Sequence, residues 1–166
     1  SSGRVEPSSA VGVASSGLMK INKNSAGRFA VDFVWRAKDA SSSFGSPISA
    51  GKKVYMVNRA GVLFTLDLET GKQLSTTRVS SGSVWATPLV AGPHLYLFGK
   101  SGKTSVLSLA SGKELAKNLT WQSDAPKAAG NRPTFSGPVL YAAVAAPPYL
   151  ILRRGDALFA VKANSN

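Results

Sequence analysis

The residues with the clearest chemical potential are basic and aromatic side chains that recur at matching places along the chain. Arg59, Lys100 and Arg154 each lie two residues beyond a short apolar run, and Phe44 and Trp85 each lie three residues before a proline. Cations and aromatic rings together bind anionic or carbohydrate-like groups through charge and stacking. The sequence therefore predicts one binding site made of these five residues. The alternative is that the cations keep turns soluble while the aromatic rings pack between sheets.

Residues suited to catalysis are scarce. His94 is the only histidine, and it sits in a Gly-Pro-His turn that predicts a surface position. Of the eight acidic residues, only Asp67 and Glu69 have the spacing of a ligand pair, and Asp67 is better placed to accept hydrogen bonds from the turn that follows it. The stretch 99–104, GKSGKT, leads into a strand rather than a helix, which argues against a phosphate-binding loop. We expect no catalytic residue and no metal site, and we leave the question of enzymatic activity open.

Composition indicates a folded β-protein with a strong basic charge. The 166 residues are 43% hydrophobic and include 16 Gly and 9 Pro between short apolar runs, which is typical of short strands joined by tight turns. The net charge of +12 favours anionic partners, yet basic residues also occur at the other turns, for example at Lys52, Lys72 and Lys113. The charge is therefore not focused, and we do not expect nucleic acid to be the partner. No apolar run is long enough for a membrane span, and the chain has no Cys.

An internal repeat explains where these side chains lie. The segment 43–74 aligns with the segment that begins at Ser83, and the matching pairs lie 41 residues apart, as Pro47 with Pro88 and Gly71 with Gly112. A third copy aligns Val54 with Tyr149 at an offset of 95. A period of about 40 residues with several short strands is typical of β-propeller blades. We expect Gly71 and Gly112 to end the third-to-fourth-strand turn with a positive φ.

The repeat predicts the division of the chain. In the first full copy, strands are expected near 47–49 and over 54–58, 62–67 and 72–79, from the centre outward. Residues 1–10 are expected to be a flexible segment, and residues 11–166 to form one β-propeller-type domain. The expected parts of this domain are a partial blade at 11–36 with strands over 11–14, 18–21 and 29–35, blades at 44–80 and 84–121, an inserted loop at 122–138 and a partial blade at 139–162.

The pattern Pro, Gly, Val-Tyr, Gly-x-Leu and Leu-Asp-x-x-Thr-Gly-Lys resembles the PQQ-like, or quinoprotein alcohol dehydrogenase-like, propeller repeat, best over 44–117. The resemblance implies an all-β fold, here an arc of about three to four four-stranded blades from a ring of about seven or eight. In the dehydrogenases of this family a Trp usually follows the turn glycine by four residues, whereas Ser75 and Ala116 stand there in this chain. A quinone site also needs calcium held by clustered oxygen ligands, which the sequence does not show. These departures favour a non-catalytic member without a cofactor.

Three functions remain open at this point. The first is a non-enzymatic scaffold that binds a protein or an anionic ligand, the second is a part of a quinone-dependent dehydrogenase, and the third is a basic protein that binds nucleic acid or another anionic surface. An arc of blades leaves sheet faces and strand edges uncovered, so we expect self-association or a protein partner, unless the chain is a fragment of a longer product. The resemblance implies a periplasmic or secreted protein, although the first ten residues do not read as a signal peptide.

Overall fold

The structure is a computed structural model that describes residues 16–120, 140–155 and 157–162, and within these ranges every regular element is a β-strand. The strands form four separate sheets, all antiparallel. The first complete sheet has the order β3-β4-β5-β6 and is built from consecutive strands, β3 (Ile48–Ala50), β4 (Lys53–Val57), β5 (Val62–Asp67) and β6 (Gln73–Arg78). These bounds agree within two residues with the strands that the repeat predicts.

The second complete sheet repeats the first. Its strands run in the same order, β7 (Leu89–Ala91), β8 (His94–Phe98), β9 (Lys103–Ser108) and β10 (Glu114–Leu119). In both sheets the pairing of the third and fourth strands shifts register at the same place. The shift lies between Thr65 and Leu66 on β5, which pairs with β6, and between Glu114 and Ala116 on β10, which pairs with β9. The equivalence between the two copies therefore extends from the sequence to the backbone pairing.

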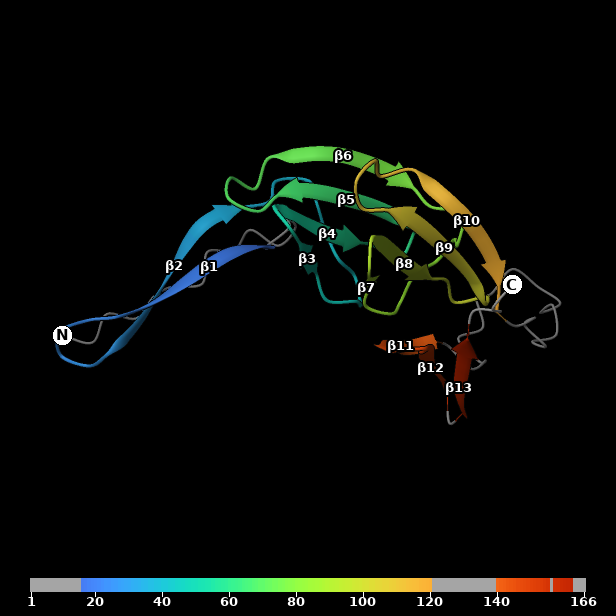
Figure 1. Ribbon diagram of the computed structural model, residues 1–166. Coiled ribbons are helices and arrows are strands. Elements are labelled where there is room, and N and C mark those ends of the chain that lie inside the picture. The colour runs from blue at the N-terminus through green and yellow to red at the C-terminus, as the bar shows by residue number, and fades with distance from the viewer. Residues whose placement is uncertain (1–15, 121–139, 156, 163–166) are drawn as a thin grey trace, which may run out of the picture.

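Two smaller sheets flank this pair. The first is a two-stranded ribbon of β1 (Gly17–Lys23) and β2 (Phe29–Arg36), which extends away from the other sheets in Figure 1. The other has three strands, β11 (Leu140–Ala146), β12 (Tyr149–Arg154) and β13 (Ala157–Lys162). The expected strand at 11–14 and the inserted loop at 122–138 lie outside the described residues.

The turn between the third and fourth strands has the predicted chemistry. Asp67 Oδ1 accepts hydrogen bonds from the Glu69 amide at 3.1 Å, the Thr70 amide at 2.8 Å and the Thr70 hydroxyl at 2.7 Å. These bonds, the one from the Thr70 side chain first, lower the pKa of Asp67, because they favour the ionised carboxylate. Gly71 and Gly112 both have φ near +70°, the left-handed region that glycine enters without strain. The interpretation of Asp67 as a turn cap is confirmed.

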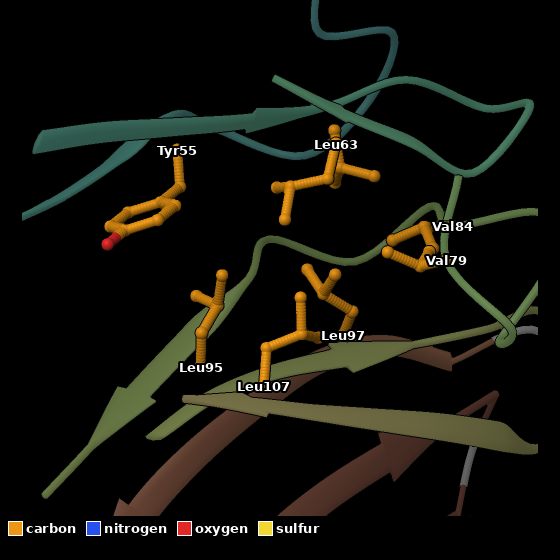
Figure 2. Close-up of a cluster of buried hydrophobic side chains, with 8 residues drawn as sticks. Tyr55, Leu63, Val79, Val84, Leu95, Leu97 and Leu107 are labelled. Atoms are coloured by element: carbon orange, nitrogen blue, oxygen red, sulfur yellow. The ribbon is translucent and has the colours of Figure 1, made fainter. Parts of the chain in front are cut away.

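The main core lies where the two complete sheets face each other. The first sheet contributes Tyr55, Val57 and Leu63, the second contributes Leu95, Leu97 and Leu107, and the connection between the sheets contributes Val79 and Val84 (Figure 2). Burying each large side chain of this kind stabilises the fold by about 1.5–3 kcal/mol. Apolar residues occupy successive positions of β4 because its two faces are both covered: Tyr55 and Val57 join this cluster, while Val54 and Met56 join a second cluster with Phe64 and Leu66.

Trp35 joins the ribbon to the first complete sheet. Its indole nitrogen donates a hydrogen bond to the Leu68 carbonyl oxygen at 2.9 Å. Its ring lies against Gly71, where a Cβ atom would stand 2.5 Å from Cδ2 of the indole. Trp35 therefore packs against the first complete sheet, and any side chain at position 71 would collide with its indole.

The two flanking sheets are much less covered than the central pair. Large apolar side chains on the ribbon and on the third sheet stay 37–72% exposed: Met19, Ile21, Phe29, Val31, Phe33, Val34, Val144, Tyr149, Leu158, Phe159 and Val161. One face of the third sheet packs on the second sheet through Leu140 and Leu152, which meet Ala86 and Phe98. Among the described residues, the chain is thus packed in its middle and open at its two ends.

Candidate binding site

The predicted site residues Arg59 and Lys100 occupy equivalent turns. In the first sheet, the Gly61 amide donates to the Asn58 carbonyl oxygen at 2.9 Å, and in the second sheet the Gly102 amide donates to the Gly99 carbonyl oxygen at 3.1 Å. Arg59 and Lys100 are each the second residue of these turns, which lie between the second and third strands. The repeat therefore presents these two cations at the same end of neighbouring sheets.

Arg154 lies differently from the other two cations. It is the last residue of β12 and pairs with Ala157 across a shorter turn. Phe64 pairs with Met56 in the first sheet, whereas its equivalent Phe159 pairs with Leu152, which shifts β12 by one residue relative to the aligned sequence. By strand pairing, Arg154 corresponds to Asn58 rather than to Arg59, and its side chain is half-buried.

The aromatic residues of the predicted site are in contact. The rings of Phe44 and Trp85 are stacked with their centroids 4.5 Å apart and their planes at 29°. Lys100 Nζ lies over the Trp85 ring at 4.9 Å from its centroid. Three of the five predicted residues, drawn from two successive repeats, therefore form one cluster, which we call the rim cluster. A cation over an indole ring is a stabilising contact in its own right.

Hydrogen bonds hold the connecting segments beside the turns. The Arg59 amide donates to the Ser43 hydroxyl at 3.0 Å, next to Phe44. In the second sheet the Lys100 amide donates to the Ser83 carbonyl oxygen at 2.7 Å, and the Trp85 indole nitrogen donates to the Ser83 hydroxyl at 3.1 Å. In both repeats, the segment that leads into the first strand thus lies beside the turn between the second and third strands.

The rim cluster presents one exposed ring and one cation, Lys100, and Arg59 is a second cation on the equivalent turn of the neighbouring sheet. Phe44 is 57% exposed, whereas Trp85 is half-buried and contacts both the Phe44 ring and the Lys100 ammonium. Phe44 is therefore the more exposed ring of the stacked pair. Arg59 is exposed beside it. Such a surface suits an anionic group that rests against Phe44 and pairs with the two cations.

Groups for acid–base or metal chemistry lie elsewhere and do not gather. Asp67 and Glu69 are at the opposite end of β5 from Arg59, and Lys52 Nζ lies 3.7 Å from the Glu69 carboxylate. His94 begins β8, where its ring meets the edge of the Tyr96 ring at 6.2 Å between centroids. Among the described residues no three His, Cys, Asp or Glu side chains are grouped closely enough to hold a metal ion. The same residues contain no helix that is long and apolar enough to cross a membrane.

Sequence reasoning missed a groove between the second and third sheets. A cavity of about 290 Å³ lies there, lined by Tyr96, Phe98, Thr104, Asn118, Leu119, Thr120, Leu150, Leu152 and Val161. Apolar side chains of the third sheet form one wall, and hydroxyl and amide groups of β9 and β10 contribute to the other. No single motif marks this groove, because it depends on how two repeats separated by residues 122–138 come together.

Solved structures with similar folds are β-propeller proteins. The chain is similar to BamB from Moraxella catarrhalis, with 17% identity and a TM-score of 0.53 over 78% of this chain and 36% of that one. It is also similar to the quinohemoprotein alcohol dehydrogenase ADHIIG from Pseudomonas putida HK5, with 14% identity and a TM-score of 0.57 over 78% of this chain and 20% of that one. The computationally designed protein Ika8 matches 90% of this chain with 44% of its own, at 13% identity and a TM-score of 0.59.

These likenesses show the fold, which is that of consecutive β-propeller blades. The chain spans less than half the length of each of the three structures. No family model and no curated protein matches the sequence.

Proposed function

We propose that this chain is a non-enzymatic β-propeller scaffold that binds protein through the uncovered faces of its end sheets. The observation that carries the proposal is the apolar face of the β1–β2 ribbon. Pairing sets Met19 opposite Phe33 and Ile21 opposite Val31, and Phe29 continues the same face toward the tip. These five side chains are 40–72% exposed. Contiguous exposed apolar side chains of this kind often mark interaction surfaces in soluble proteins.

The opposite face of the ribbon is more polar. Asn22 pairs with Ala30 and Lys20 with Asp32, and the Asn22 side-chain amide donates to the Asp32 carboxylate at 2.8 Å. Antiparallel sheets with one apolar and one more polar face commonly have the apolar face covered. The core between the two complete sheets shows how such a face is covered in this fold, namely by the face of another sheet.

Self-association is the simplest way to supply that sheet, and a site-specific cross-linking experiment tests it. A photoreactive benzoylphenylalanine at position 31, on the apolar face, should cross-link the chain to a second protein molecule. The same group at position 30, on the polar face, should not, although the two sites are neighbours. Equal cross-linking from the two positions, or none from position 31 in purified protein or in extract from the cells that express it, would refute the use of this face.

A second part of the proposal assigns an anionic ligand to the rim cluster, with Arg154 as an additional cation. The stacked Phe44–Trp85 pair beside Lys100 and Arg59 supports it. Heparin serves as the probe. Exchanging Arg59, Lys100 and Arg154 for Glu should weaken heparin binding by about tenfold or more, because three attractive charges become repulsive. Exchanging Lys52, Lys72 and Lys113 for Glu, at the opposite end of the sheets, should weaken heparin binding less.

Two controls separate binding at the rim cluster from misfolding and from the effect of overall charge in the heparin experiment. Because Arg154 is half-buried, the double exchange of Arg59 and Lys100 alone is measured as well, with circular dichroism as the check on folding. Equal weakening by the two triple exchanges would mean that heparin responds to the overall charge of +12 rather than to the rim cluster. Steep salt dependence without any preference for the rim would instead favour the general anionic-surface function.

The resemblance also supports a periplasmic or secreted location as part of this proposal. The competing dehydrogenase function predicts that added quinone and calcium stabilise the chain against heat and change its visible absorption. The scaffold proposal predicts neither effect.

A further inference from the structure

A polar cavity lies between the two complete sheets, beside the connection from β6 to β7. Its volume is about 410 Å³. Ser80 and Ser81 of the connection line one side, and the outer strands β9 and β10 line the other (Figure 1). Lys103 and Lys117 are part of the lining, and among the described residues no acidic side chain is. The cavity is therefore suited to a negatively charged group.

The two lysines lie on the same face of the second sheet. Lys117 of β10 pairs with Ser105 of β9, and Lys103 lies two residues before Ser105, so the three side chains share one face. This face is turned toward the connection, because the Ser81 amide donates to the Ser105 hydroxyl at 2.9 Å. Lys117 Nζ lies 3.6 Å from the Glu114 carboxylate, whereas Lys103 has no ion pair among the described residues. Lys103 therefore brings a positive charge that no carboxylate offsets.

The hydroxyl of Ser81 has an unused donor in this cavity. The residue is 1% exposed, and its hydroxyl oxygen is buried with no hydrogen-bond partner. Buried hydroxyls nearly always have a partner, because an unpaired one is destabilising. The neighbouring Ser80 hydroxyl is already used, since it donates to the Glu114 carboxylate at 2.6 Å. Ser81 lines the cavity, so rotation about its Cα–Cβ bond turns the hydroxyl toward a group that binds there.

The equivalent place in the first repeat is apolar. The residues that stand 41 positions before Ser81, Lys103 and Ser105 are Ala40, Val62 and Phe64. Ala40 and Phe64 are buried in one hydrophobic cluster, and Val62 packs against it. The third strand of the third sheet also has phenylalanine, Phe159, at its third position. The fold therefore accepts apolar side chains at these positions, and the serines and the lysine distinguish this one junction between sheets.

We propose that this cavity binds a phosphate group. Lys103 supplies the main charge, the Ser81 hydroxyl donates a hydrogen bond, and Lys117 adds a charge that it shares with Glu114. The site has no residue in common with the rim cluster or with the apolar face of the ribbon, so it does not rest on the proposed function. The phosphate belongs either to the free ion or to a small phosphate ester, and the two sources can be distinguished by experiment.

Thermal unfolding followed by circular dichroism tests the proposal with inorganic phosphate as the probe. Phosphate is varied at constant ionic strength, with chloride making up the difference, and should raise the melting temperature of the unchanged protein. Ser81→Ala should weaken phosphate binding about tenfold, because one hydrogen bond to a charged group is lost. Lys103→Gln should weaken it about two- to fivefold, the range for one exposed charge. Lys113→Gln, a matched exchange at the opposite end of β10, should leave the affinity unchanged.

Stability without phosphate separates loss of the site from damage to the fold. Ser81→Ala should melt at the same temperature as the unchanged protein or higher, because it removes an unpaired buried hydroxyl and introduces the residue that the first repeat has at position 40. A lower melting temperature would show that the hydroxyl has a structural partner, and would overturn the proposal. Phosphate binding that is equal in the unchanged protein and in Ser81→Ala, or a melting temperature that does not respond to phosphate, would also overturn it.

Amide hydrogen exchange locates the bound phosphate. Phosphate should slow exchange at residues 79–84 and 103–105, and it should do so equally in the double variant Arg59→Gln and Lys100→Gln. Loss of this effect in the double variant would assign the phosphate to the rim cluster and refute the site. Glycerol 3-phosphate, measured beside inorganic phosphate, distinguishes the two sources. Tighter binding of the ester would identify a phosphate carried on a larger molecule, and equal or weaker binding would identify the free ion.

Discussion

The contact between Trp35 and Gly71 can be isolated by comparing two equivalent glycines. Gly71 and Gly112 hold the same turn position with the same φ of +70°. A Cβ atom added at Gly71 would meet the Trp35 indole, with the nearest atom at 2.5 Å, whereas one added at Gly112 would meet nothing within 4 Å. Alanine at position 112 therefore introduces backbone strain alone, about 1–2 kcal/mol. Alanine at position 71 introduces the same strain and also displaces Trp35.

The expected size of the second effect follows from overpacking. Forcing a Cβ atom into an occupied site costs about 1–3 kcal/mol. We therefore expect Gly71→Ala to lower the free energy of unfolding by about 2–5 kcal/mol and Gly112→Ala by about 1–2 kcal/mol. Urea unfolding followed by far-ultraviolet circular dichroism measures the two values without relying on tryptophan fluorescence.

Removing the indole provides the control. Trp35→Ala loses the hydrogen bond to Leu68 and part of the apolar contact, yet it leaves room for a side chain at position 71. In the Trp35→Ala background, the effects of Gly71→Ala and Gly112→Ala should become equal within about 0.5 kcal/mol. If the two glycine variants are equally stable with Trp35 present, or if the difference persists without it, the ribbon does not dock on the first complete sheet as described.

The remaining predictions concern the core and the response to acid. Leu97→Ala should lower the free energy of unfolding by about 2–5 kcal/mol, because Leu97 is fully buried between the complete sheets, whereas Leu158→Ala, at 72% exposure, should change it by less than about 1 kcal/mol. The pKa of Asp67 is lowered in the fold, so its stabilisation is present above its unfolded pKa and is lost as the pH falls through the folded value; Asp67→Asn should flatten the acid limb of a stability-versus-pH curve. Glu114→Gln should act in the same direction, because desolvation raises the pKa of Glu114 but hydrogen bonds from Ser105 and Ser80 outweigh it and leave the pKa lowered.

Much of the fold could be predicted because the sequence repeat follows the repeat of the sheets. Offsets between matching glycines and prolines located the strands of the complete sheets, and Asp67 indicated the turn that follows it. The same offsets placed Arg59, Lys100, Phe44 and Trp85 at one end of the sheets, and the structure shows the connections there joined by hydrogen bonds.

What could not be predicted depends on contacts between repeats. Aligned positions are equivalent, but equivalence does not say that Phe44 stacks on Trp85 across two sheets. The shorter turn after β12 moves Arg154 out of the matching position, and a one-residue change in a turn is invisible to an alignment that follows side-chain types.

The open arc is the central feature of this account, and the mass of the chain in solution tests it most directly. Size-exclusion chromatography with light scattering should give a mass above the 17.3 kDa of one chain, because uncovered apolar sheet faces associate. Val31→Asp, on the apolar face of the ribbon, should shift the mass toward one chain, whereas Ala30→Asp on the polar face should not. A stable 17.3 kDa species at every concentration, unchanged by Val31→Asp, would contradict the account, because it would mean that the ends of the arc need no cover.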